Sequence, residues 1–294
     1  MSFREFTANI LSTRDFEETR LKSIVVGEIT EYLKEINAGI GKEKGFSFIM
    51  FDNGDEIYDS LKGVGGYSGV MIKSPYYIGL TNLKEEPEID FYGAYYMQSV
   101  VRKLYEMELG SCWINIRSIP YEMKSKLLKN HAGNINYLLA FGIIDEKAVK
   151  QKAPQLAVEN KSDEFRQDPY GTRVNEAADT DKARHSLLEI VYLHEWGKPA
   201  AYEDLESRGM ADIFYYVRNA PSYKNLQPCR LILKDGEVEL ALLNPEKEGS
   251  YIDAGIMMYT MEGLAKDMGI PAKWHFIKQE SKNKEYSVAA KIEL

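Results

Sequence analysis

The stretch YGAYYMQSVVRKLYEMELGSCWINI, residues 92–116, has a counterpart near the end of the chain, DAGIMMYTMEGLAKDMGIPAKWHFI, residues 253–277. The two align without a gap, with two methionines and the tryptophan at matching places. In each copy apolar residues recur every three or four positions, which predicts an amphipathic helix that ends near Gly110 or Gly269, with an apolar strand after the tryptophan. We interpret the chain as two related halves, and chance similarity between two amphipathic helices is the alternative.

The halves also agree in layout upstream of these helices. A helix at 23–36, a loop from residue 37 and a strand at 46–51 correspond to a helix at 210–220, a loop and a strand at 230–234. Further strands are predicted at 74–81, 136–144, 238–243 and 287–294. Helices with a small, mostly antiparallel sheet in each half predict an α+β fold.

A polar segment with little hydrophobic periodicity and a Pro-Tyr-Gly turn separates the two halves. We therefore predict a first half at residues 1–155, a linker at 156–180 and a second half at 181–294.

Composition limits the function. The chain has 294 residues, is 44% hydrophobic and 28% charged, and carries a formal net charge of −8, which gives no support to nucleic-acid binding. Its apolar runs are too short to cross a membrane and its N-terminus lacks the pattern of a signal peptide, so we expect a cytoplasmic protein. Two cysteines make no disulfide framework, Cys229 is expected to be a buried thiol, and the four histidines show no metal-ligand spacing.

One turn distinguishes the halves. NAPSYKNLQPCR, residues 219–230, combines two prolines with serine, asparagine and glutamine, whereas the matching place in the first half is NAGIGKEKGF, residues 37–46. Prolines stiffen the turn, and its hydroxyl and amides offer donors and acceptors that suit the edge of a planar heterocycle. The alternative is that Ser222 and Asn225 only satisfy local backbone groups.

Three motifs resemble the nitroreductase family of FMN-dependent oxidoreductases. Residues 220–230, APSYKNLQPCR, resemble its Ala-Pro-Ser-x-x-Asn-x-Gln-Pro-Trp motif, and AYYMQSVVRKLYEMELGSCWI, residues 94–114, resembles its central helix and Gly-Leu-Gly-Thr-Cys-Trp segment. STRDF, residues 12–16, resembles the end of its N-terminal basic motif. Their order fits two nitroreductase-like halves in tandem, and the chain is similar to a single-chain tandem subgroup over nearly its full length.

The resemblance implies that a monomer replaces the usual homodimer, with the two halves forming an internal pseudo-dimer. One FMN would lie between the halves, because the first half holds the basic motif and the Cys-Trp segment while the second half holds the Pro-Ser-x-x-Asn turn. The mirror site would lack its turn, and ARHSL, residues 183–187, resembles a remnant of the basic motif there.

Site residues follow from the same resemblance. Pro221, Ser222 and Asn225 should line the flavin, and Gln227 should support the turn. Arg14 would stabilise negative charge at the pyrimidine end of the ring. The implied cofactor-binding residues are Ser12, Arg14, Trp113, Ile114, Asn115, Ile116, Pro221, Ser222 and Asn225. Ser12 would reach the ribityl chain or phosphate, the backbone N–H groups from Ile114 to Ile116 would approach flavin N5, and a core aromatic is the alternative for Trp113.

The sequence also departs from the family pattern. Ile10 and Leu11 replace arginines of the basic motif, so the phosphate needs charge from elsewhere, with Lys150 and Lys152 as candidates by position. Glu108 replaces the first glycine of the Gly-Leu-Gly segment.

The implied activity is hydride transfer from NADH or NADPH through FMN to a small-molecule electron acceptor such as a nitroaromatic or quinone. No catalytic side chain and no metal are required. A flavin-binding protein that stores or senses FMN without turnover is the alternative.

Overall fold

The computed structural model describes residues 1–66, 69–128, 134–148, 184–245, 247, 249–277 and 285–294. Contacts divide the chain into two compact units. The N-terminal unit comprises Ile10–Ile89 and the described residues from Ser99 to Ala148. The C-terminal unit comprises Met1–Asn9, Asp90–Gln98 and the described residues from Arg184 onward. The predicted halves 1–155 and 181–294 remain a prediction, and the predicted linker 156–180 lies outside the described residues.

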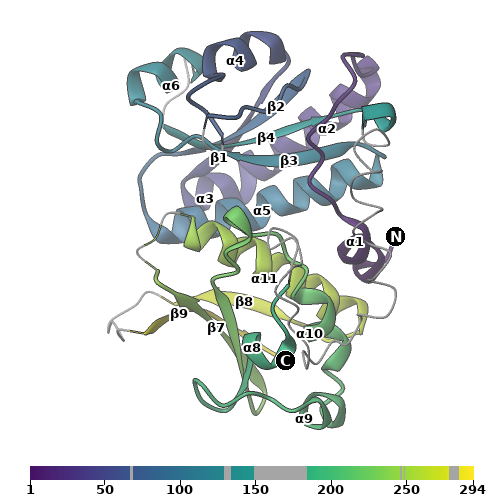
Figure 1. Cartoon of the computed structure of the whole chain (residues 1–294), viewed down its shortest axis with the longest axis vertical. Coiled ribbons are helices and arrows are strands. Elements are labelled where there is room, and N and C mark those ends of the chain that lie inside the picture. Colours follow the sequence, from purple (N-terminus) through teal and green to yellow (C-terminus); the bar gives the residue numbers. More distant parts are fainter. Residues whose placement is uncertain (67–68, 129–133, 149–183, 246, 248, 278–284) are drawn as a thin grey trace. The chain divides into compact units, whose positions relative to one another are not determined.

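The N-terminal unit is a four-stranded antiparallel sheet with helices on both faces. Its elements are α2 (Ser23–Ile36), α3 (Lys42–Lys44), β1 (Phe46–Phe51), α4 (Gly54–Leu61), β2 (Tyr76–Asn82), residues 87–89 and 99–106 of α5 (Pro87–Glu106), β3 (Gly110–Asn115), α6 (Tyr121–Leu128) and β4 (Asn134–Gly142). The strands lie in the order β1-β2-β4-β3. Helices α4 and α6 cover one face, and α2 and α3 cover the other (Figure 1).

Apolar alternation along the strands builds the core beneath α4 and α6. Ile57 and Leu61 of α4 and Leu127 of α6 pack with Ile114 of β3 and other buried side chains. Ile114 and Ile116 are buried in this cluster, whereas Trp113 and Asn115, one position out of phase, are only partly buried. The period of two along a strand explains why neighbouring residues have such different surroundings.

The C-terminal unit is a five-stranded sheet with α11 on one face. Its elements are α1 (Phe3–Asn9), α8 (Leu187–Ile190), β5 (Val191–Leu193), α9 (Tyr202–Ser207), α10 (Ala211–Val217), β6 (Cys229–Lys234), β7 (Glu237–Leu243), α11 (Ser250–Asp267), β8 (Lys273–Phe276) and β9 (Tyr286–Glu293). The strands lie in the order β5-β6-β7-β9-β8, antiparallel except for the β5–β6 pair. Helix α11 contacts β6, β7 and β8, while α1 and α10 pack against α11.

The two sheets confirm the repeat predicted from the sequence. Strands β6, β7, β9 and β8 follow one another across their sheet as β1, β2, β4 and β3 do, and β5 is an addition at one edge. The register shifts at equivalent places, between Leu80 and Thr81 in β2 and between Leu240 and Ala241 in β7. The α+β prediction is therefore correct, with the same antiparallel core in each half.

The repeated helices α5 and α11 also end in the same way. Glu108 and Gly269 both have positive φ, at 60° and 77°. The next residue donates its N–H to a carbonyl five positions back, Leu109 to Leu104 and Ile270 to Ala265, both at 3.0 Å. This is the Schellman ending, for which glycine is the usual residue at the left-handed position. Glu108 therefore has a conformation that glycine, as at Gly269, adopts without strain.

Two local predictions were wrong. The first half has no loop after residue 36, because Asn37–Gly41 forms a π-helical turn that leads into α3. The chain kinks at Gly39, whose φ of −90° and ψ of −108° are not helical, and no proline stops the helical turn as Pro221 and Pro228 do in the other half. The Asn37 side chain bonds both backbone groups of Phe48. The tryptophans lie within strands β3 and β8 rather than before them.

Candidate functional site

The turn at residues 220–228 is held in an uncommon backbone conformation. Lys224, Asn225 and Gln227 have φ values of 51°, 53° and 44°, in the left-handed region that residues other than glycine rarely adopt. Each such residue costs on the order of 1 kcal/mol, and strain of this kind gathers at ligand-binding loops. Three strained residues within four positions point to a turn shaped for a purpose beyond joining α10 to β6.

Side chains inside the turn maintain this shape. The Ser222 hydroxyl accepts a hydrogen bond from the Gln227 N–H at 2.9 Å. The Gln227 side chain accepts from the His185 N–H at 2.9 Å and donates to the Asn225 carbonyl at 3.2 Å. The expected supporting role of Gln227 agrees with these bonds. The Ser222 bond is also the local role that the alternative interpretation gives to this serine.

Arg184 holds the side chain of Asn225, the remaining polar residue of the turn motif. Its Nη1 donates to Asn225 Oδ1 at 2.9 Å and to the Ala220 carbonyl at 3.3 Å. Burial, and then the positive charge of Arg218, lower the pKa of the Arg184 guanidinium. Arg184 belongs to the stretch 183–187, which by its sequence resembles a remnant at a mirror site, yet in the structure it bonds the intact turn.

A buried carboxyl lies beneath the turn. Asp253, in the first turn of α11, accepts a hydrogen bond from the Tyr223 N–H at 2.9 Å. Burial raises the pKa of Asp253 to about 8, so the carboxyl is mostly neutral at pH 7. A cavity of about 10 Å³, room for about one water, lies between Asp253, Ser222 and Arg218. Neighbouring Cys229 is fully buried, and burial raises the pKa of its thiol well above the usual value.

In the N-terminal unit, the segment that carries Ser12 and Arg14 runs beside β3. Ser12 forms a parallel bridge with Ser111, and the Thr13 N–H donates to the Ser111 carbonyl at 2.9 Å. Gly110 permits this approach, since a Cβ there would lie 2.5 Å from Thr13 Oγ1. Both Ser12 and Arg14 are exposed, and both lie close enough to Cys112 to influence the pKa of its thiol. Burial raises the pKa of Cys112, and the charge of Arg14 partly opposes this effect.

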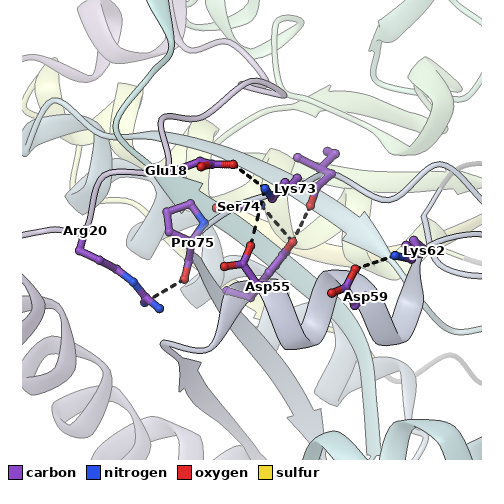
Figure 2. A network of polar contacts seen from close by, with 10 residues as sticks. Glu18, Arg20, Asp55, Asp59, Lys62, Lys73, Ser74 and Pro75 are labelled. Carbon is purple, nitrogen blue, oxygen red and sulfur yellow. Dashed lines mark hydrogen bonds and ion pairs between the residues drawn. The ribbon is translucent and has the colours of Figure 1, made fainter.

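Contacts further along the chain fix this segment in place. The Glu17 N–H donates to the Ile143 carbonyl at 2.9 Å. Figure 2 shows Lys73 between Glu18 and Asp55, at 2.5 Å and 3.8 Å, and Arg20 at the Pro75 carbonyl, 3.4 Å away. These exposed ion pairs contribute little to stability individually. Together with the β3 contacts, they fix the path of the segment on both sides of Arg14.

The backbone of β3 defines which peptide groups face outward. The Ile116 N–H donates to the Asn136 carbonyl at 2.9 Å, inside the sheet. Because N–H directions alternate along an antiparallel strand, the Ile114 N–H also points toward β4, while those of Trp113 and Asn115 point to the outer edge. The Asn115 carbonyl accepts from the Gly66 N–H at 3.2 Å on that edge.

The structure thus gathers the predicted site residues in two groups. Ser12, Arg14 and the predicted β3 residues lie together in the N-terminal unit, and the Pro221, Ser222 and Asn225 turn lies in the C-terminal unit. The phosphate candidates Lys150 and Lys152 lie outside the described residues. Trp274, the repeat of Trp113, is buried and donates to the Met258 carbonyl at 3.0 Å, whereas Trp113 is only partly buried.

Sequence reasoning missed two residues of the turn's surroundings. Asp253 stands out in the sequence only as the first residue of the second repeat, and nothing in that pattern marks a buried carboxyl. Arg184 could have been found, because it lies in the ARHSL stretch, but its spatial partner could not be inferred.

Neither a metal site nor a membrane span is found in the described parts of the chain. Among those residues, no three histidine, cysteine or acidic side chains converge as a metal site would require. Across the same ranges, no helix combines the length and apolar character needed to cross a membrane.

The family follows from comparison with known proteins. Residues 8–169 match the model of the family described as "Putative TM nitroreductase". This match covers more than half of the chain, and the chain therefore belongs to this nitroreductase family. A comparison with curated proteins finds no match.

Solved structures of nitroreductases are similar to this chain. A crystal structure described as a putative nitroreductase from Thermotoga maritima aligns over 100% of this chain and 94% of its own, with 14% identity and a TM-score of 0.58. An FMN-dependent nitroreductase from Clostridium difficile covers 48% of this chain and 86% of its own, at 20% identity and a TM-score of 0.39. A nitroreductase with bound FMN from Bacteroides fragilis covers 50% of this chain and 90% of its own, at 14% identity and a TM-score of 0.41. The Thermotoga match identifies a nitroreductase fold across the whole chain.

Proposed function

We propose that this protein is a flavin oxidoreductase that binds one FMN per chain and uses NADH or NADPH to reduce a nitroaromatic, quinone or similar acceptor. The observation that carries the proposal is the strained turn with Pro221, Ser222 and Asn225, in a chain that belongs to a nitroreductase family. Only one half contains such a turn, which supports a single site rather than two.

The donor set of the two groups fits FMN. The turn provides a hydroxyl and a carboxamide beside rigid prolines, which suits a ring edge carrying both C=O and N–H groups. Exposed Arg14 provides a positive charge, and Ser12 provides a second hydroxyl. A pocket for an anionic flavin nucleotide needs this mixture of neutral and cationic donors.

Each residue has a defined task in this proposal. Pro221, Ser222 and Asn225 hold one side of the ring, and Arg14 stabilises negative charge at its pyrimidine end. Of the predicted backbone N–H groups from Ile114 to Ile116, that of Asn115 points outward from β3 and would approach flavin N5, with Trp113 beside it. Ser12 binds the ribityl chain or phosphate. FMN, when bound, would supply hydride transfer from the nicotinamide to the acceptor. No side chain of the chain is required to transfer a proton, so we assign no catalytic residue.

A storage or sensing protein that binds FMN without turnover is the second candidate. The loss of the leading arginines of the basic motif, replaced by Ile10 and Leu11, favours it. Binding and turnover distinguish the two, because both proteins would be yellow and only the oxidoreductase would oxidise NAD(P)H with an acceptor present.

The test is flavin stoichiometry and turnover in matched variants. The protein should bind one FMN per chain and oxidise NADH or NADPH in the presence of a quinone. Asn225→Gly keeps a residue suited to positive φ but removes the carboxamide, and should weaken FMN binding. Asn244→Gly is the control, since Asn244 has a φ of 50° in a different turn.

The outcomes separate the candidates. Two FMN molecules per chain would refute the single site. Tight binding without NAD(P)H oxidation would favour the storage or sensing protein. A protein that binds no flavin would remove both functions and leave the fold unchanged.

A further inference from the structure

Three arginines surround the turn, and none of them is neutralised by a described residue. Arg184 donates to Asn225 and Ala220, Arg218 donates to the Tyr215 carbonyl at 3.2 Å, and Arg230 donates to the Gln227 and Cys229 carbonyls at 2.8 and 2.9 Å. Every one of these acceptors is a neutral oxygen. Within the described ranges, no carboxylate lies at ion-pair distance from any of the three guanidinium groups.

Two of the three arginines are close enough to interact. Both lie beside Ala220, because Arg184 donates to its carbonyl at 3.3 Å and Arg218 lines the small cavity that Ala220 and Ser222 also line. Burial, and then the charge of Arg218, lower the pKa of Arg184, so the two guanidinium groups repel each other. A guanidinium group stays protonated under ordinary conditions, so the repulsion is not relieved by loss of a proton. An anion between the two groups would relieve it.

The nearest buried acid does not supply that anion. Asp253 lines the same cavity, but burial raises its pKa to about 8 and leaves it mostly neutral at pH 7. Arg230 is 8% exposed and is committed to the backbone of the turn, where it braces Gln227 and Cys229. The turn therefore carries a local positive charge in a chain whose formal net charge is −8.

Donor capacity remains on the two interacting arginines. Arg184 uses Nη1 for both of its hydrogen bonds to the turn, and Arg218 uses Nε, while its ring-facing guanidinium lies 4.7 Å from the centre of Tyr215. Among the described residues, nothing accepts a hydrogen bond from the Nη atoms of Arg218. Arginine forks of this kind match the oxygens of a phosphate group better than a lysine does.

We propose that Arg184 and Arg218 bind the phosphate monoester of the flavin nucleotide. This inference rests on the proposed function and answers where the phosphate finds its charge, given that Ile10 and Leu11 replace the arginines of the first basic motif. The ARHSL stretch would then serve the intact turn of its own half instead of being a remnant. Arg184 would have a double role, because it also holds the Asn225 carboxamide.

The decisive comparison is FMN against riboflavin, which has the same ring and ribityl chain but no phosphate. Binding to the flavin-free protein would be measured by quenching of flavin fluorescence. Wild type should bind FMN more tightly than riboflavin. Arg218→Gln should lower the affinity for FMN by roughly 10- to 100-fold and leave the affinity for riboflavin unchanged. Inorganic phosphate should compete with FMN in wild type and much less in the variant.

Matched variants isolate the effect of the charge. Arg208→Gln is the control, because Arg208 lies in the same unit but pairs with Asp235 at 2.9 Å. Arg184→Lys keeps the charge and should retain more of the FMN preference than Arg184→Gln. Arg218 gives the cleaner test, since loss of Arg184 also releases Asn225. Riboflavin affinity reports at the same time whether each variant is folded.

Each outcome decides the proposal. An Arg218→Gln protein with wild-type preference for FMN over riboflavin would overturn it. An equal loss of affinity for FMN and for riboflavin would also overturn it, and would assign Arg218 a structural role. A changed KM for NADPH but not for NADH, with FMN binding intact, would show that the arginines bind the nicotinamide nucleotide and would overturn the proposal. If wild type binds neither flavin, the proposed function fails, and this inference fails with it.

Discussion

Gly255 of α11 lies against the backbone at Phe91 of α5 so closely that a Cβ at position 255 would be 2.2 Å from the Phe91 carbonyl oxygen. The Tyr95 nitrogen would be 2.9 Å from the same Cβ. Both neighbours are backbone atoms of a helix, which cannot move aside as a flexible side chain can. Both also belong to the C-terminal unit, so this approach is part of its core.

Gly255→Ala should therefore destabilise the protein by about 1–3 kcal/mol, the usual cost of overpacking a core. Denaturant unfolding would measure it. Gly27→Ala is the control, because Gly27 lies within α2 and a Cβ added there would have no atom within 4 Å, so alanine should stabilise by about 0.5–1 kcal/mol. Equal effects at the two positions would contradict the close approach of the helices.

Glu108→Gly should stabilise the protein by about 1 kcal/mol. Glu108 is exposed and has a φ of 60° at the end of α5, where the equivalent helix α11 has Gly269. Glycine adopts this conformation without the steric cost of a Cβ. The thermal unfolding midpoint would show the change. Glu106→Gly, inside the same helix, should lower the midpoint, and a drop in both variants would exclude the Schellman ending described above.

Asp253→Asn should change how stability depends on pH. The folded pKa of Asp253, about 8, lies above the ordinary aspartate value of 3.8, so the folded state holds a proton that the unfolded state releases. The contribution of Asp253 is fully present below about pH 4 and is lost as pH rises through about 8. The variant should therefore gain on wild type by roughly 1 kcal/mol per pH unit between pH 5 and pH 8.

Asparagine keeps an oxygen that can accept from the Tyr223 N–H, so the comparison isolates the proton. Urea unfolding at several pH values would measure the difference. A constant gap between variant and wild type across this range would show that Asp253 is ionised in the folded state.

Both cysteines should resist thiol reagents in the native protein. Cys112 and Cys229 are free and buried, and burial raises the pKa of each thiol, so little reactive thiolate forms. A chromogenic disulfide reagent should modify neither quickly at pH 8 and both after addition of denaturant. Cys112→Ala and Cys229→Ala variants would assign any remaining reaction to one position. Rapid native modification of Cys229 would contradict its burial beneath the turn.

Much of the fold could be predicted because it depends on local patterns. Periodicity located α2, α5 and α11, and runs of apolar residues located β1, β2, β4, β6, β7 and β9. The prediction of a loop after residue 36 was wrong, because Asn37 and the glycines near it, although individually poor in helices, form a helical turn that is kinked at Gly39 and leads into α3. Strand β5 was missed, since three residues are too few to show a period.

Only part of the candidate site could be predicted from such local sequence patterns. The motif at residues 220–228 identified the turn, and Gln227 was correctly assigned to its support. The positive φ values of Lys224, Asn225 and Gln227 could not be predicted, because lysine and glutamine carry no preference for that conformation. The partners of Ser12 and Arg14 on β3 also required the sheet to be assembled.

The sequence by itself determined the tandem repeat, the α+β class and the asymmetry between the two turns, because each can be recognised from continuous stretches of the chain. Only the tertiary structure decided that Arg184 meets Asn225, 41 positions away, and that Asp253 lies buried against Tyr223. These contacts depend on how the strands and α11 pack, and packing sets both which charges meet and how far each is removed from water. The positive charge around the turn is therefore a property of the folded chain.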